Sequence, residues 1–158
     1  MIRFCPTCWN DVPAEATACP TCGASLIETL DFTDKLIAAL RHRESTRAGL
    51  AIDVLTRWQP DLRAVVPLCD LLDQATDASI LKQAALGLGR LRDQQAVPAL
   101  SRLLLNESRA FVARQAAAEA LGQIGGAEAR QALHDALDDE LASIRAAAQC
   151  ALEFGVQS

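Results

Sequence analysis

Four cysteines near the start of the chain have the spacing that is typical of a metal-binding site. They form two C-x-x-C pairs, Cys5 with Cys8 and Cys19 with Cys22. Thiolates bind Zn²⁺ strongly, and two such pairs joined by a short loop can supply all four ligands of one tetrahedral site. The spacing therefore predicts a zinc site made by Cys5, Cys8, Cys19 and Cys22.

Two other uses of these cysteines are a pair of disulfides and a redox-active C-x-x-C motif. No apolar stretch of signal-peptide length precedes Cys5, so we expect a cytoplasmic protein, in which thiols stay reduced. A redox motif usually lies in a βαβ unit, which this sequence does not suggest. Zinc is the favoured reading. Since four thiolates leave no coordination position for water or substrate, its role would be structural. We expect Phe4 and Trp9 to cover it.

Outside this cluster the sequence offers few catalytic candidates. The two histidines, His42 and His134, belong to no recognisable triad, and the chain has no P-loop or dinucleotide fingerprint. Cys69 and Cys150 fall at apolar helical positions, where a cysteine usually acts as a small buried hydrophobic residue. We therefore predict no catalytic residue and expect that the protein is not an enzyme.

Composition and charge indicate the class of fold and of partner. Hydrophobic residues make up 51% of the 158 positions but aromatic residues only 4%, so the apolar content is mainly Ala, Leu, Val and Ile. This composition suits closely packed helices. The net charge of −5 disfavours a nucleic-acid partner, because an acidic chain has no general attraction for phosphates. No apolar run reaches the length of a membrane span.

A repeated segment follows the cysteine region. Its clearest copy is 113–124, similar copies occupy 80–91 and 144–152, and a weaker one occupies 46–55. The clear copies are offset by 33 and 31 residues. A period of this length is typical of two helices per unit, stacked into a solenoid in which each unit buries its apolar side against the next.

The chain after the cysteine region is therefore expected to consist of helices. Pro67 and Pro98 fall in predicted first turns, and Asp31, Asp77 and Ser108 are candidate N-caps. The predicted organisation is a zinc-binding lobe over 1–24, a linker over 25–32 and an all-α solenoid over 33–158. We expect about eight helices, at about 33–42, 45–58, 62–73, 78–91, 96–105, 109–123, 127–138 and 141–154.

The segment from Arg114 to Gly125, Arg-Gln-Ala-Ala-Ala-Glu-Ala-Leu-Gly-Gln-Ile-Gly, resembles the HEAT-like repeat of the phycobilisome-lyase type. Segments 144–152 and 96–100 extend this resemblance, which covers about residues 33–154. It implies a short HEAT-like α-solenoid. The first 24 residues resemble a double-knuckle zinc ribbon, a common appendage of bacterial proteins.

The resemblance also implies a binding surface, since in this family the helix with the V-R-x-x-A-A-x-A-L-G pattern tends to line the concave side. A protein partner is expected there. Large apolar residues on this side could instead close gaps between repeats. Arg114 and Arg145 are expected to pair with acidic residues of neighbouring turns. The candidate partner-binding residues are Lys82, Gln83, Leu86, Arg90, Phe111, Val112, Gln115, Glu119 and Gln123.

Together these features favour a non-enzymatic scaffold or adaptor that binds a protein partner and contains structural Zn²⁺. One alternative is a bilin lyase-like or chaperone-like subunit that acts with a partner, as some proteins with such repeats do. A second alternative is a zinc-ribbon protein associated with nucleic acid, which the net charge disfavours.

Overall fold

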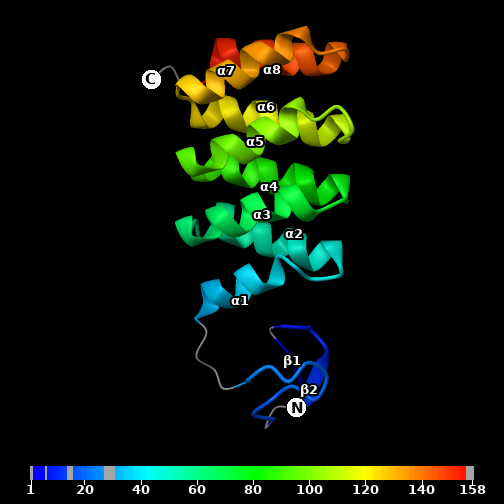
Figure 1. The fold of residues 1–158 in the computed structure, drawn as a ribbon. Helices are drawn as coiled ribbons and strands as arrows, with labels where there is room; N and C mark the ends of the chain where they lie inside the picture. Colours follow the sequence, from blue (N-terminus) through cyan, green and yellow to red (C-terminus); the bar gives the residue numbers. More distant parts are fainter. Residues whose placement is uncertain (1, 6, 14–15, 27–30, 156–158) are drawn as a thin grey trace.

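The computed structural model describes residues 2–5, 7–13, 16–26 and 31–155, and shows a small N-terminal lobe followed by a stack of helices (Figure 1). In the lobe, β1 (Ile2–Phe4) pairs antiparallel with β2 (Asp11–Pro13), so that Arg3 lies opposite Val12. A further bridge joins Ala18 to Ser25. The buried apolar residues of the lobe are few, and two of them are cysteines: Cys5, Val12, Cys19 and Leu26.

Eight α-helices follow in the part of the chain that the structure describes. Short 3₁₀ turns precede α3 and α5 and follow α7, and a π-helical turn, Val54–Trp58, continues α2. The predicted all-α solenoid is therefore confirmed over the described residues. The helices are α1 (Phe32–Ala39), α2 (Ser45–Asp53), α3 (Val65–Gln74), α4 (Ala78–Leu91), α5 (Val97–Leu105), α6 (Phe111–Ile124), α7 (Ala127–Asp135) and α8 (Ala142–Phe154).

The helices form successive hairpins that stack in two layers (Figure 1). The even-numbered helices α2, α4, α6 and α8 pack against one another in order, and α3, α5 and α7 form the other layer. Buried Ala, Leu, Ile and Val side chains make one continuous core from Ala39 to Ala148. This arrangement is what the repeat period predicts, because each hairpin covers the apolar side of the one before it.

Small residues let the even-numbered helices approach closely. A Cβ atom added to Gly89 of α4 would lie 2.9 Å from the Cα atom of Ala120 in α6. One added to Gly122 of α6 would lie 3.0 Å from the Cβ atom of Ala151 in α8. A side chain at Gly89 would therefore clash with α6, and one at Gly122 would press tightly against α8, so the small residues allow close packing of these helices.

Two of the three predicted N-caps, Asp31 and Asp77, are observed. Asp31 accepts a hydrogen bond from the backbone N–H of Asp34, and Asp77 accepts from that of Ser79. The expectation for Ser108 is wrong, because α6 begins after Ala110. The Ser108 N–H instead donates to the side chain of Asn106, 3.1 Å away, within the turn that follows α5.

Aromatic residues of the lobe face the first helical hairpin. The Trp9 ring packs against the helical core and meets the His42 ring edge to face, with centroids 5.1 Å apart. The Arg47 guanidinium lies 4.8 Å from the centre of the Phe4 ring. Both residues thus join the lobe to the solenoid, and the expectation that they also cover the cysteines stays a prediction.

The predicted linker 25–32 begins inside the lobe, since Ser25 pairs with Ala18 and Leu26 is buried there. Residues 27–30 of this linker and 156–158 of the predicted solenoid lie outside the described residues. The division into domains stays a prediction. Among the described helices, none combines the length and the apolar character needed to cross a membrane.

Candidate metal centre and inner groove

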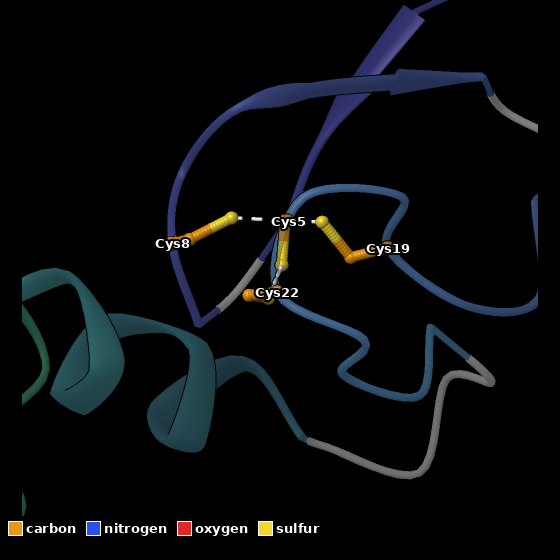
Figure 2. A group of neighbouring side chains, drawn as sticks. All are labelled: Cys5, Cys8, Cys19 and Cys22. Carbon is orange, nitrogen blue, oxygen red and sulfur yellow. Dashed lines mark hydrogen bonds between the residues drawn. The ribbon is translucent and has the colours of Figure 1, made fainter.

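The four cysteines of the lobe converge on one point (Figure 2). Their sulfur atoms all lie within 4.8 Å of one another. The Sγ atoms of Cys5 and Cys22 are 3.6 Å apart, and those of Cys8 and Cys19 are 3.5 Å apart. Cys5 and Cys19 are buried, Cys8 is half-buried and Cys22 is exposed. The predicted ligands are thus brought together into a cluster that could hold a metal ion.

Two turns of the same design position these sulfurs. In the first turn the N–H of Trp9 donates to the Cys5 carbonyl oxygen at 2.8 Å, and in the second the N–H of Gly23 donates to that of Cys19 at 2.8 Å. Both residues lie in the left-handed region, with φ of 60° for Trp9 and 72° for Gly23. Glycine adopts this conformation readily, whereas for tryptophan it is strained.

The surroundings of the sulfurs favour thiolates at some positions and oppose them at others. Desolvation raises the pKa of Cys19, but the backbone N–H groups of Cys22 and Thr21 outweigh it and bring the pKa to about 6. At Cys22 the N–H of Ala24 lowers the pKa, but desolvation and the other three cysteines raise it to about 12. The four sulfurs therefore resist carrying four negative charges at once, and a bound cation would relieve that repulsion.

A groove of about 670 Å³, named here the inner groove, runs over α4, α6 and α8. Its floor is largely apolar, while Lys82, Arg92 and Glu119 add charged groups. Many of the residues predicted to form the partner-binding face line this groove: Lys82, Leu86, Val112, Gln115, Glu119 and Gln123.

Three residues predicted for the same face, Gln83, Arg90 and Phe111, are not part of the groove lining. The Gln83 side chain turns toward α2, where Gly49 leaves room for its amide. Its Oε1 atom is buried without a hydrogen-bond partner. Arg90 and Phe111 are exposed.

The groove also contains residues that the sequence analysis missed, chiefly Arg92, Cys150 and Phe154. Cys150 is exposed, so the expectation that it is buried is wrong. The repeat itself contained the signal, because Cys150 is offset by 31 residues from Glu119, and Glu119 by 33 from Leu86. Cys69 is half-buried, and desolvation raises its pKa to about 11.

The two repeat arginines have different partners. Arg114 is buried, and its Nε donates to the Leu104 carbonyl oxygen at 2.7 Å while its Nη2 pairs with the Asp139 carboxylate. The expected acidic partner of Arg114 is thus present in the next repeat. Arg145 instead donates to the backbone carbonyl oxygens of Asp139 and Glu140, at 2.6 and 2.9 Å.

Comparison with known proteins gives one family match and two informative relatives. The family described as HEAT repeats matches residues 33–113 and 65–153. Deoxyhypusine hydroxylase-B of Oryza sativa subsp. japonica is 43% identical over 67 residues, which cover 41% of this chain and 22% of that protein. The structure of human deoxyhypusine hydroxylase in complex with glycerol has a TM-score of 0.67 and 25% identity, covering 77% of this chain and 42% of that one.

These matches correct the expectation that the protein is not an enzyme. The chain is related in sequence and in fold to deoxyhypusine hydroxylase, which is an enzyme by name. The relation is partial, because this chain spans less than half the length of either relative. The finer resemblance to repeats of the phycobilisome-lyase type stays a prediction.

Proposed function

The chain belongs to the HEAT-repeat family, and from that premise we propose that its inner groove binds a segment of a partner protein. The observation that carries this proposal is the groove along α4, α6 and α8. We further propose that Zn²⁺ occupies the four-cysteine cluster and maintains the fold of the N-terminal lobe.

The chemistry of the groove suits a peptide segment. Leu86 and Val112 offer apolar surface, and Phe154, with 82% of its surface exposed, extends that surface at one end. Lys82 and Glu119 supply charges of opposite sign nearby. An apolar floor gives affinity through burial, and a few charged groups fix the orientation and register of the bound chain.

The donor set fits Zn²⁺. Zinc–sulfur bonds of about 2.3 Å in a tetrahedral site require sulfur atoms about 3.8 Å apart, close to the 3.6 and 3.5 Å between Cys5 and Cys22 and between Cys8 and Cys19. Zn²⁺ bound by four thiolates has no free coordination position, so it would catalyse no reaction. Its binding would add folding free energy on the order of 10 kcal/mol. The lobe needs such a contribution, since its apolar core is very small.

The groove is tested by affinity purification from the native cell followed by quantitative mass spectrometry. Leu86→Asp and Val112→Asp place a charge on the groove floor, so a protein partner should be lost from both. Val66→Asp is the matched control, because Val66 is exposed on α3 in the other layer. Circular dichroism should show the same helicity in all variants. Equal recovery of every co-purifying protein with the groove variants and the control would refute the groove as the binding surface.

A second candidate function is a part in the hydroxylation of deoxyhypusine, which the two relatives favour by their names. We propose that the chain would then bind the substrate protein in the same groove. The test adds the purified chain to a deoxyhypusine-containing protein in a cell extract that supplies oxygen and reductant. A mass gain of one oxygen atom, dependent on the chain and lost with Val112→Asp, is expected; no gain above extract alone would exclude this candidate.

A further inference from the structure

A second hollow lies where the N-terminal lobe meets the first helical hairpin. It has a volume of about 850 Å³. One wall comes from lobe residues between Phe4 and Asp11, and the other from the corner between α1 and α2, from Arg41 to Arg47. It shares no residue with the groove over α4, α6 and α8.

Three arginines, Arg41, Arg43 and Arg47, line this cleft in a chain whose net charge is −5. Arg41 lies 4.0 Å from Asp70, a loose pair in which both side chains are exposed. Arg43 has no ion pair among the residues that the structure describes. Exposed pairs contribute little stability, so a carboxylate from a ligand can replace such a neighbour at small cost.

The acidic groups of the cleft limit which ligand fits. Glu44 already pairs with Arg47 at 2.9 Å, and Asp11 lies on the lobe wall. A long polyanion would meet these carboxylates and the negative charge of the rest of the chain, which disfavours nucleic acid. A short peptide can instead place separate carboxylates on Arg41 and Arg43, whose planar forks match that group.

Aromatic surface lies beside these charges. The Phe4 ring has Arg47 over it, and 47% of the residue's surface is still exposed. Trp9 is held against His42 and remains partly exposed at the cleft. The cleft therefore offers an apolar contact next to two arginines that are not held in close ion pairs.

We propose that this cleft binds an acidic peptide segment of a partner protein, with carboxylates on Arg41 and Arg43 and an apolar side chain against Phe4. The site is independent of the inner groove. It uses the lobe as one wall, so it exists only while the lobe is folded against α1 and α2.

Fluorescence anisotropy of the full chain tests this proposal with three labelled probes of equal length. They are a peptide of Glu and Leu, the same peptide with Gln in place of Glu, and a single-stranded oligonucleotide. The acidic peptide should bind most tightly, and its affinity should fall as salt is added. Arg43→Glu should weaken it by about tenfold, the effect of losing one charge-assisted contact.

Two controls keep the result specific. Arg57→Glu makes the same charge change on the exposed turn after α2 and should leave binding unchanged. Leu86→Asp should also leave it unchanged, which separates this site from the inner groove. The proposal is overturned if the acidic peptide does not bind, if Arg43→Glu and Arg57→Glu act alike, if Leu86→Asp abolishes binding, or if the oligonucleotide binds more tightly.

Discussion

At the residue scale, Arg114 shows how one side chain connects consecutive repeats. Its guanidinium is 1% exposed and contacts the carbonyl oxygen of Leu104 and the carboxylate of Asp139. It therefore links the end of α5 to the turn before α8. A buried charge is tolerated only while its partners are in place, so the pair is a sensitive point of the stack.

Replacing Asp139 with Asn should destabilise the protein by about 3 kcal/mol, because the Arg114 charge would remain buried without a counter-charge. The free energy of unfolding in urea measures this change. Asp135→Asn is the control, because Asp135 is exposed on α7, where its carboxylate accepts a hydrogen bond from the Gln131 side chain at 2.8 Å. Equal stability of the two variants would contradict a structural role for the pair.

The same pair gives a pH dependence. Desolvation raises the pKa of Asp139, but the N–H of Leu141 and Arg114 outweigh it and hold the pKa below its usual value. The stabilisation is therefore complete above the unfolded-state pKa of about 3.9 and is lost as the pH falls through the lower folded-state value. In Asp139→Asn the free energy of unfolding should therefore decrease less steeply as the pH falls through this acidic range.

The cysteines give a second prediction at this scale. Mass spectrometry under native conditions should find one Zn²⁺ per chain, and Cys8→Ala should lose it, because three thiolates hold the ion less tightly than four. Cys69→Ala is the control, since Cys69 lies on α3. Removing the metal should also shift the fluorescence of Trp9, measured in a Trp58→Phe background. Full metal retention in Cys8→Ala would contradict the four-cysteine site.

At the scale of elements, the stack depends on small residues at helix contacts, and α8 differs from α6 in this respect. Where α6 has Ala118 and Gly122, α8 has Gln149 and Glu153 at the repeat offset of 31 residues. Gln149 donates to Glu153 at 2.6 Å, and both are exposed. This side of α8 is thus polar, whereas the equivalent side of α6 has small residues that pack against α8.

Gly122→Leu should lower the free energy of unfolding by about 1–2 kcal/mol, because the clash with α8 exceeds the gain from replacing a helical glycine. Glu153→Leu places leucine at the repeat-equivalent position of α8, where the residue is exposed, and should cost almost nothing. Thermal unfolding of both variants measures this difference in stability. If Gly122→Leu is as stable as Glu153→Leu, the close approach of α6 and α8 is not required.

Helix positions could be predicted from the sequence because the repeat period and local caps such as Asp31 and Asp77 determine them. The convergence of the four cysteines could also be predicted, because C-x-x-C turns depend on local sequence. The prediction of Ser108 as an N-cap is wrong because Asn106, two residues earlier, accepts a hydrogen bond from Ser108 in a competing turn. Gln83 lies outside the groove lining because its direction depends on the space at Gly49, a tertiary contact that no local pattern reveals.

At the scale of the whole molecule, the N-terminal lobe lies at one end of the two-layer helical stack (Figure 1). The inner groove lies over α4, α6 and α8. The relation to deoxyhypusine hydroxylase could not be predicted from the repeat pattern, because that pattern encodes packing and is shared by proteins of many functions. The groove and the lobe cleft use different residues, so each proposal stands or fails by itself.

The most direct measurement is site-specific photo-crosslinking in the native cell, with the photoreactive residue at Gln115 of the groove or at Gln131, exposed on α7 in the other layer. We expect a discrete protein adduct from position 115, lost when Leu86→Asp is added, and none from position 131. Adducts from position 131 alone, or adducts from position 115 that Leu86→Asp leaves unchanged, would contradict it.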